Sequence, residues 1–327
     1  MIARRRLLIA AGASALVAPF GSFAQKQGKV WRIGFLGPTS AAGIAKRLAA
    51  LRAGLRELGY LEGKNLSIDF RWAEGEYSRL PGLAQELVAL NPDLIVTHTA
   101  PGTIAAGQAT RTIPIVMMAV GDAIASGLVT NMARPGGNIT GLSFFTPELN
   151  EKRLEMVKET LPQIRRVAFL YNSSNNANPV PVHKMHAVAA KLKLELIPVG
   201  VTSPYEFENA MTELRKQNIG AVAIYDDAML IANSDLLARL ATRQRVPSFG
   251  FSEIAEPGGL LAYGVDLPAL AHRSAAFADK ILRGANPGEL PIEQPTKFEL
   301  VINMKTAKAL GIKIPQSILV RADRVIE

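Results

Sequence analysis

The segment Trp31–Leu36, WRIGFL, and the helix that follows it decide the fold. The segment is a short apolar run, which is typical of a strand buried on both faces. After it, five apolar residues are spaced by four, three, four and three, so they share one helix face. They are Ile44, Leu48, Leu51, Leu55 and Leu58. Gly59 is expected to end this helix.

The alternation of strand and helix continues along the chain. We expect further strands at 66–71, 93–97, 113–117 and 139–144, with a helix marked by Leu80, Leu83, Leu87 and Leu90. The pattern restarts after Pro147 with a helix over 148–160 and strands at 166–171, 195–199, 221–225 and 247–250. Alternating strands and helices indicate parallel sheets covered on both faces. The fold class predicted is α/β, with two doubly wound parallel-sheet lobes.

The C-terminal stretch is too short for a third domain. It contains expected strands at 260–265 and 298–302 and helices at 267–283 and up to Leu310. We expect these pieces to complete both lobes: lobe 1 over 29–143 plus about 264–297, and lobe 2 over 144–263 plus about 298–327. The chain then crosses between the lobes several times. Such crossings form a multi-strand hinge beside a cleft, where ligands bind beyond the carboxyl ends of the strands.

Residues 1–24 are typical of an export signal peptide. Arg4, Arg5 and Arg6 precede an apolar stretch from Leu7 to about Phe20, and the small residues Ser22 and Ala24 suit cleavage after Ala24. The arginines fit either a general secretory or a twin-arginine route. The chain has no cysteine, which excludes disulfides and a lipid anchor on a cysteine. We expect a periplasmic protein that is not inserted in the membrane after processing.

The charge pattern does not favour nucleic acid as a partner. The formal net charge is +9, and removal of the three signal arginines leaves 34 basic and 28 acidic residues, or +6. The basic residues are scattered, without a stripe or interleaved aromatics, which is typical of a solvated surface.

The sequence contains no catalytic motif. We find no G-x-S-x-G, no G-x-G-x-x-G and no P-loop, and Gly34–Pro38 has the wrong glycine spacing. His183 and His186 are three apart but lack an evident third ligand, so a surface helix is favoured over a metal site. His98 follows a strand and is compatible with either a structural or a functional role. We expect no catalytic residue, no metal and no cofactor.

Polar strand-to-helix loops point to a small-ligand cleft. Loops at the carboxyl ends of strands present backbone N–H groups at helix N-termini, which bind carboxylates. An amino acid solute would also need a carboxylate partner for its ammonium group, and an aromatic residue would stack on an apolar part. Asp226 is equally compatible with a helix-capping role, together with Asp227. The candidate ligand-binding residues are Thr39, Ser40, Thr99, Ala100, Pro101, Asp122, Asn172, Ser173, Asp226, Phe251 and Glu253.

Eight sequence blocks carry a resemblance to a known family. They are Gly54–Tyr60 (GLRELGY), Arg71–Gly75 (RWAEG), Ala109–Ile115 (ATRTIPI), Ala133–Leu142 (ARPGGNITGL), Gly258–Gly264 (GGLLAYG), Lys280–Gly284 (KILRG), Leu290–Phe298 (LPIEQPTKF) and Val301–Gly311 (VINMKTAKALG). Together they resemble one family of ABC-transporter substrate-binding proteins, which has the type 1 periplasmic-binding-protein fold and includes tryptophan and tyrosine binders. The resemblance implies a monomer that captures a small solute by hinge closure and delivers it to a membrane permease.

Three alternatives stay open at this point. A two-domain α/β enzyme would use the same cleft. The effector-sensing part of a transcription regulator shares the two-lobed fold but would need a DNA-binding segment where this chain has its signal. A periplasmic sensor feeding a membrane receptor is not distinguished from an importer component by these residues.

Overall fold

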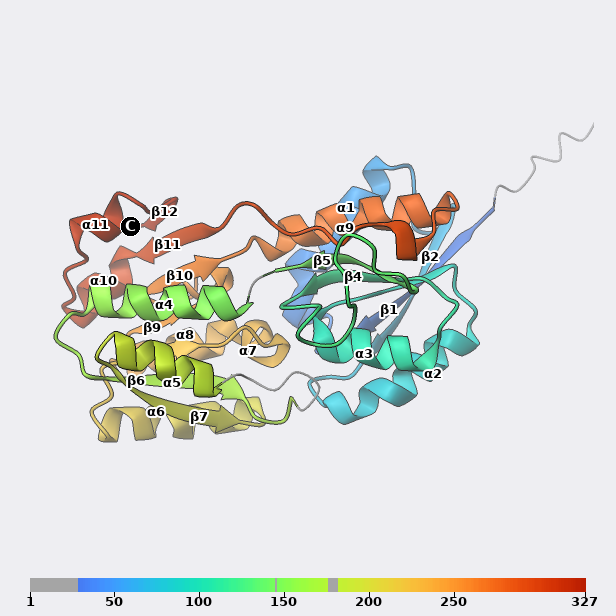
Figure 1. Cartoon of the computed structure of the whole chain (residues 1–327). Helices are drawn as coiled ribbons and strands as arrows, with labels where there is room; N and C mark the ends of the chain where they lie inside the picture. The colour runs from blue at the N-terminus through green and yellow to red at the C-terminus, as the bar shows by residue number, and fades with distance from the viewer. Residues whose placement is uncertain (1–28, 145, 176–181) are drawn as a thin grey trace, which may run out of the picture. The chain divides into compact units, whose positions relative to one another are not determined.

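The computed structural model describes residues 29–144, 146–175 and 182–327. The predicted signal peptide, with Arg4–Arg6, Ser22 and Ala24, lies outside these residues. The fold described below is that of one compact unit, Trp31–Glu327, whose elements are labelled in Figure 1. Two sheets organise it, as the alternating sequence pattern predicts.

The first sheet contains five parallel strands in the order β2-β1-β3-β4-β5. Its helices are α1, which packs with α9 on one face, and α2 and α3, which pack together on the other (Figure 1). The bounds are β1 Trp31–Gly37, α1 Ala45–Glu57, β2 Leu66–Trp72, α2 Leu80–Ala89, β3 Leu94–Thr97, α3 Thr99–Ala109, β4 Ile115–Val120, β5 Ile139–Ser143 and α9 Leu267–Leu282.

The alternation of side chains along the strands explains the two layers of helices. In β3, Leu94 and Val96 join the core that includes Leu51 of α1, whereas Ile95 joins the core that includes Leu87 of α2. Successive strand residues point to opposite faces, so a strand that is apolar throughout needs a helix layer on each side. Of the five apolar residues predicted to share the inward face, Ile44, Leu48, Leu51 and Leu55 are buried, whereas Leu58 follows the end of α1 and is 37% exposed.

The second sheet has the order β12-β11-β10-β9-β8-β6-β7. Its helices and strands, coloured green to red in Figure 1, follow β5 in the chain. The bounds are α4 Thr146–Thr160, β6 Arg166–Asn172, α5 Val182–Lys191, β7 Glu195–Val201, α6 Phe207–Lys216, β8 Ala221–Ile224, α7 Ala228–Ala232, α8 Ser234–Arg243, β9 Ser248–Gly250, β10 Leu261–Gly264, β11 Glu299–Asn303, α10 Met304–Leu310, α11 Gln316–Leu319 and β12 Arg324–Ile326. Short 3-10 helices supplement these elements, and η4, Ser252–Ile254, is the one that matters below.

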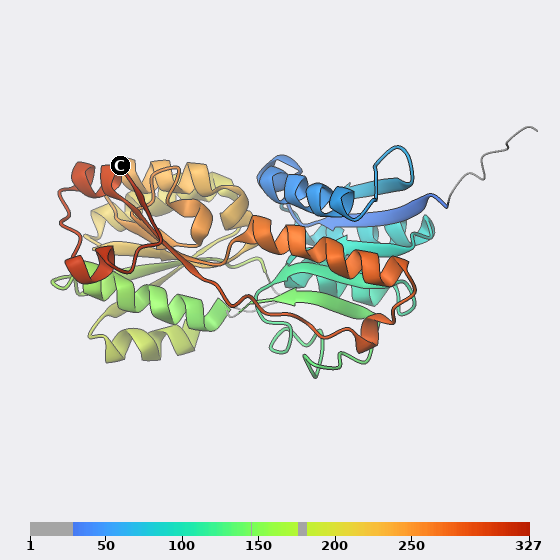
Figure 2. The same cartoon turned by 90° about the horizontal axis from the view of Figure 1, so that it is seen from above.

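This sheet is not wholly parallel, which corrects the sequence-based expectation. Strand β11 pairs antiparallel with β10, with Leu261 opposite Ile302. The chain leaves β10 for α9, which packs on the first sheet, and then returns (Figure 2). The chain returns to the second sheet at the same end of the strands from which it left, beside the first sheet. Strand β11 therefore runs away from that end, opposite to β10.

Two other details differ from the sequence-based expectation. The alternation of single helices and strands does not predict two consecutive helices between β8 and β9, where α7 and α8 meet at Asn233, whose backbone is not helical (φ −114°, ψ 25°). Helix α11 and strand β12 were not anticipated. They contain four and three residues, which is too short for a periodic pattern.

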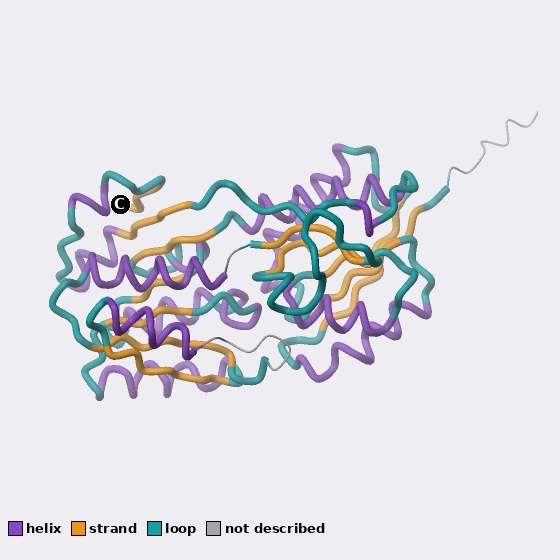
Figure 3. The backbone as a smooth tube through the Cα atoms, viewed as in Figure 1, coloured by secondary structure: helices purple, strands orange, loops and turns teal. Residues whose placement is uncertain are grey.

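The chain passes between the sheets after β5, after β10 and again before β11 (Figures 2 and 3). We call the first sheet with α1, α2, α3 and α9 lobe 1, and the second sheet with its helices lobe 2. The segment before β11 is fixed to lobe 1, because Glu293 N donates to Gly141 O at 2.9 Å. These passages form the predicted multi-strand hinge, while the exact lobe bounds given above stay a prediction.

Candidate functional site

A small cavity lies where residues that follow the strands of both lobes meet. We call it the inner cavity; its volume is about 30 Å³. Its position matches the rule that open α/β sheets bind ligands beyond the carboxyl ends of their strands. It is lined by Arg47, His98, Thr99, Ala100, Pro101, Ala119, Gly121, Phe144, Thr146, Asn175, Asp226, Asp227, Ala228, Ile231 and Leu267.

The lobe 1 wall of the inner cavity is the N-terminus of α3. His98 precedes the helix in an extended conformation and makes no side-chain capping bond, so the first N–H groups of α3 lack a side-chain cap. Its imidazole is 1% exposed, and neither ring nitrogen has a hydrogen-bond partner. Burial, assisted by the charge of Arg47, holds the pKa of His98 well below its usual value. The ring is therefore neutral at physiological pH.

Two threonine hydroxyls also line the inner cavity, Thr99 on this wall and Thr146 at the start of α4 in lobe 2. Thr99 Oγ1 and Thr146 Oγ1 are buried and have no hydrogen-bond partner. Thr99 adopts a left-handed backbone conformation, with φ 65°. A neutral imidazole and two hydroxyls can donate or accept hydrogen bonds, so the cavity offers unused polar groups to whatever enters it.

The lobe 2 wall contains two carboxylates that are already bonded. Asp226 forms a buried, two-pronged ion pair with Arg153: Nη1 contacts Oδ2, and Nη2 donates to Oδ1 at 3.0 Å. Asn150 Nδ2 also donates to Asp226 Oδ2, at 3.3 Å. Arg153 is fully buried on α4. The pair leaves Asp226 with little unused acceptor capacity.

Asp227 is the helix cap that the sequence offered as one alternative. Its Oδ1 accepts from Met229 N at 2.9 Å, at the start of α7. It also accepts from Asn172 Nδ2 at 3.0 Å and from Tyr77 Oη at 3.1 Å, and Asn175 Nδ2 donates to Oδ2 at 3.0 Å. Burial raises the pKa of Asp227. Because Tyr77 belongs to lobe 1, this carboxylate also bonds the two lobes together.

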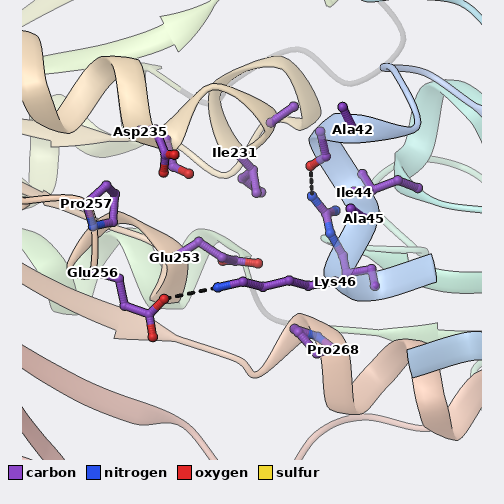
Figure 4. Close-up of a pocket in the computed structure, with 14 residues that line it drawn as sticks. Ala42, Ile44, Ala45, Lys46, Ile231, Asp235, Glu253, Glu256, Pro257 and Pro268 are labelled. Carbon is purple, nitrogen blue, oxygen red and sulfur yellow. Dashed lines mark hydrogen bonds and ion pairs between the residues drawn. The ribbon is translucent and has the colours of Figure 1, made fainter. Parts of the chain in front are cut away.

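A larger pocket adjoins the inner cavity and shares Arg47 and Ile231 with it. We call it the outer pocket; its volume is about 550 Å³, which is in the range of small-molecule sites. Figure 4 shows the carboxylate of Glu253 directed into it and Lys46 crossing to Glu256. Lys46 Nζ lies 3.1 Å from Glu256 Oε2, a second bond between the lobes.

Besides the exposed Asp235, two charged groups in the outer pocket lack an ion-pair partner within bonding distance. Arg47 is 5% exposed, and its Nη2 donates to Gly43 O at 3.3 Å. Burial lowers the pKa of Arg47, and the charge of Glu253 acts in the opposite direction. Glu253 Oε2 is buried without a hydrogen-bond partner, and burial raises the pKa of this carboxyl.

The structure brings some of the predicted residues together. Thr99, Ala100, Pro101 and Asp226 line the inner cavity, and Glu253 lines the outer pocket. Thr99, Ala100 and Pro101, expected in a strand-to-helix loop, instead belong to the first turn of α3, because the helix begins directly after His98.

Thr39 and Ser40 line a third pocket at the junction of the lobes, of about 600 Å³. Thr39 Oγ1 is buried without a partner there, whereas Ser40 Oγ accepts from Gly43 N at 3.2 Å.

The other predicted residues line none of these three pockets. Asp122 accepts from Ile124 N and Ala125 N and so stabilises a turn. Asn172 holds Asp227, and Ser173 is exposed. Phe251 is 2% exposed within the hydrophobic core.

Several lining residues were not singled out by the sequence. Arg47 carried one signal: it directly precedes Leu48 and follows Ile44 by three, so a charge interrupts the apolar face of α1. Thr146, Asn175, Ile231 and Leu267 carried no such signal. Sequence alone does not show which polar residues beside the hinge face the other lobe.

Neither a metal centre nor a membrane span is found in the residues that the structure describes. Within 29–144, 146–175 and 182–327, no group of three or more histidine, cysteine, aspartate or glutamate side chains is placed to hold a metal ion. His183 and His186 are exposed on α5. No helix in these same ranges is long and apolar enough to cross a membrane.

A protein-family model for ABC transporter substrate-binding proteins matches residues 32–326. The chain belongs to this family. The match spans both lobes and the hinge, as the sequence blocks suggested. A curated relative, the tyrosine-binding protein of Clostridioides difficile (strain R20291), is 29% identical over 79% of this chain and 74% of its own length.

Solved structures of this family share the fold of both lobes. A crystal structure from Streptococcus pneumonia in complex with L-Trp has 28% identity and a TM-score of 0.82, covering 90% of this chain and 99% of that chain. A conserved domain protein from Vibrio cholerae has 29% identity and a TM-score of 0.83, covering 91% and 100%.

The ligand-free, open structure of CD0873 from Clostridium difficile, a substrate-binding protein with adhesive properties, agrees less well. Its TM-score is 0.63 at 26% identity, with 91% of this chain and 99% of that chain covered. Identity and coverage barely differ from those of the L-Trp complex. The structure of this family member as a whole is therefore more similar to that of the L-Trp complex.

Proposed function

We propose that this family member is the periplasmic solute-capturing component of an ABC-type importer. Residues 1–24 direct its export and are then removed. Between its lobes it binds a small organic solute. This solute is an amino acid or a carboxylate, and the range includes aromatic compounds. It then docks as a monomer on a membrane permease. Binding proceeds by hinge closure and needs no catalytic step, metal or cofactor. The family match and the ligands named for its relatives support this proposal.

The observation that carries the proposal is the set of unpaired polar groups in the inner cavity. His98 and Thr99 of lobe 1 and Thr146 at the start of lobe 2 are buried there without hydrogen-bond partners. A buried polar group without a partner costs about 1–3 kcal/mol. A solute that supplies partners to groups on both lobes removes this cost only when the lobes are together. It therefore binds the closed form better than the open form.

The contacts between the lobes support capture by closure. Tyr77 and Asp227 are hydrogen-bonded across the cleft, as are Lys46 and Glu256. The inner cavity of about 30 Å³ has room for only about one or two water molecules. A larger solute must therefore enter while the lobes are apart, and the hinge closes over it.

The α3 N-terminus is the place for a carboxylate. The helix has 11 residues, and its first three, Thr99, Ala100 and Pro101, line the inner cavity beside His98; Pro101 contributes no N–H group. Unpaired N–H groups and the helix dipole favour an anion at this end. The proposal thus assigns lobe 1 to the negatively charged part of the solute.

Native mass spectrometry of protein purified from a periplasmic extract tests this function. We expect a small molecule to remain bound, the mature chain to begin at Gln25, and no conversion of that molecule in a turnover assay. Small-angle scattering should show compaction when the solute is added to ligand-depleted protein. Retention of Arg4–Arg6, or the lack of any bound or compacting solute, contradicts the proposal.

A further inference from the structure

The two bonds between the lobes described above differ in their exposure to solvent. In the ion pair of Lys46 with Glu256 the side chains are 78% and 46% exposed, and Glu256 is shared with Arg324 of lobe 2. Exposed ion pairs of this kind contribute little to holding two surfaces together. Asp227, in contrast, is 4% exposed, and Tyr77 of lobe 1 is hydrogen-bonded to it. The bond of Tyr77 is therefore the one of the two that can hold the lobes in contact.

The Tyr77 hydroxyl is bonded to lobe 2 in two ways. Tyr77 begins η2, Tyr77–Arg79, which leads into α2 of lobe 1. Its Oη donates to Asp227 Oδ1 at 3.1 Å and accepts from Met229 N at 3.2 Å. Burial, together with the charge of Asp227, holds the pKa of Tyr77 well above its usual value, so the hydroxyl keeps the proton that it donates. We call Tyr77, Asp227 and Met229 the inter-lobe latch.

The lobe 2 half of the latch is held in place by its own lobe. Asp227 Oδ1 accepts from Met229 N at 2.9 Å and from Asn172 Nδ2 at 3.0 Å. Asp227 Oδ2 accepts from Asn175 Nδ2 at 3.0 Å. These bonds orient the carboxylate before the lobes meet, so little freedom is lost when Tyr77 arrives. Protein groups alone complete the latch, and it needs no solute.

Tyr77 does not face the space that a solute would occupy. It lines neither the inner cavity nor the outer pocket nor the third pocket. Asp227 lines the inner cavity, and Met229 lines the third pocket. Removal of the Tyr77 hydroxyl therefore weakens the contact between the lobes without altering a group that lines these cavities.

From this geometry we infer that the inter-lobe latch closes the lobes without a solute, and that it raises the affinity for every solute by the same factor. Part of the solute-free protein then occupies the closed form. The apparent affinity of a solute that binds the closed form is proportional to the population of that form. The groups that line the cavities select the solute, whereas Tyr77 sets how tightly any solute is held. The effect on affinity rests on the proposed function, but the latch itself does not.

Single-molecule fluorescence of solute-depleted protein tests the latch. The chain has no cysteine, so dyes can be attached through Lys64→Cys in lobe 1 and Lys308→Cys in lobe 2, which are both exposed positions. We expect the wild-type protein to show a closed population, with the dye distance of the present structure. Tyr77→Phe should lower the ratio of closed to open molecules by about tenfold to a hundredfold, as for a hydrogen bond to a charged group.

Tyr60→Phe is the matched control. It removes a bond of the same kind, from Tyr60 Oη to Asp279 Oδ1 at 2.9 Å, but both residues belong to lobe 1. It should leave the ratio of closed to open molecules unchanged. Thermal unfolding identifies any variant that fails to fold, and the closed population of the wild-type protein then still decides the matter.

Calorimetry measures the effect of the latch on affinity. The probes are L-tyrosine and L-tryptophan, because relatives are named for binding them. Tyr77→Phe should weaken the binding of both by one common factor of up to about a hundredfold, and Tyr60→Phe should weaken neither. If a different solute co-purifies, it and a close analogue replace these two probes.

The outcomes separate this inference from the proposed function. A wild-type protein with no closed population in the absence of solute overturns the inference, and so does a Tyr77→Phe variant that keeps the wild-type ratio. Unequal weakening of the two probes would show that Tyr77 contacts the solute and also overturns it. Each of these results leaves the solute-capturing function intact. If no solute of any kind binds, the proposed function fails, whereas the fluorescence measurement still decides whether the latch closes the lobes.

Discussion

At the scale of single residues, the cleft contains one buried ion pair and several buried groups without partners. The side chains of Arg153 and Asp226 are 0% and 5% exposed, and the arginine bonds to the carboxylate through Nη1 and Nη2. Arg153 Nε also donates to Tyr263 O at 2.8 Å, at the end of β10. The arginine therefore ties α4 to the hinge and neutralises a carboxylate at the inner cavity. His98, in contrast, is buried with neither nitrogen bonded.

Replacing Arg153 with methionine should destabilise the protein strongly, because Asp226 would be left buried without its counter-charge. We expect a loss of about 3–5 kcal/mol in the free energy of unfolding, measured with urea. Arg243→Met is the control, since its ion pair with Glu208 is exposed and should be worth at most about 1 kcal/mol. Equal losses in the two variants would contradict this account of the buried pair.

His98 should make the free energy of unfolding of the protein depend on pH. The folded state holds the pKa of His98 well below the 6.5 of an exposed histidine, so the unfolded chain binds the extra proton between these values. Stability from this group is therefore lost as the pH falls below about 6.5, by up to about 1.4 kcal/mol per pH unit. Unfolding of His98→Leu should lack this component, whereas His183→Leu should retain the wild-type slope. A His98→Leu slope equal to that of the wild type would contradict the buried, neutral ring.

At the scale of elements, strand ends and hinge segments position the site. Only His98 separates the end of β3 from the start of α3, which places the uncapped N-terminus of the helix at the cleft. Strand β5 leads directly to the hinge and contains Gly141, with φ 129°. A side chain there would begin 2.2 Å from Met117 O, in a conformation that other residues rarely adopt. The hinge end of lobe 1 therefore depends on this glycine.

Gly141→Ala should destabilise lobe 1, because the new methyl group collides with the backbone of β4 and the residue keeps a strained φ. We expect a loss of at least about 1–3 kcal/mol, measured by chemical denaturation. Gly137→Ala is the matched control in the same connection, since nothing lies within 4 Å of the added atom and its φ is not in the strained range. A neutral Gly141→Ala variant would show that β4 and β5 can separate there without cost.

At the scale of the whole molecule, the lobes approach closely beside the outer pocket. A Cβ added at Gly43 of lobe 1 would lie 2.6 Å from Ala232 Cβ of lobe 2. Gly43 also offers its carbonyl to Arg47 and its N–H to Ser40. The contact is made only when the lobes are together, so this position tests closure without altering a charged residue of the pocket.

Gly43→Ala should weaken solute binding while leaving each lobe folded. The added methyl group obstructs the closed form, and overpacking of this kind costs about 1–3 kcal/mol. Affinity for the captured solute should then fall by about fivefold to more than a hundredfold. Scattering should also show less compaction on binding. Gly82→Ala on α2, where nothing lies within 4 Å of the added atom, should leave the affinity unchanged. Unaltered affinity in Gly43→Ala would contradict the closed arrangement as the binding form.

The sequence by itself determined the two-lobed α/β fold, the order of most elements and the family. Apolar runs such as Leu94–Thr97 and the spaced leucines of α1 reflect local geometry and burial, which a linear pattern records. The sequence pattern did not predict the antiparallel direction of β11, because strand direction depends on the path of the chain through the other lobe. The sequence pattern also did not predict the short elements α11 and β12, because three or four residues are too few to show a hydrophobic periodicity.

Only the tertiary structure decided how the polar residues of the cleft are used. From the sequence, Asp122, Asp226 and Glu253 were equivalent carboxylates after strands, and Arg47 was one charge within a helix. In the folded chain, Asp226 forms an ion pair with Arg153, and Asp122 accepts hydrogen bonds within a turn. Glu253 and Arg47 have no ion-pair partner and lie on facing lobes. The physical reason is that a hydrogen bond or ion pair depends on distances between segments far apart in the chain. No local pattern encodes those distances.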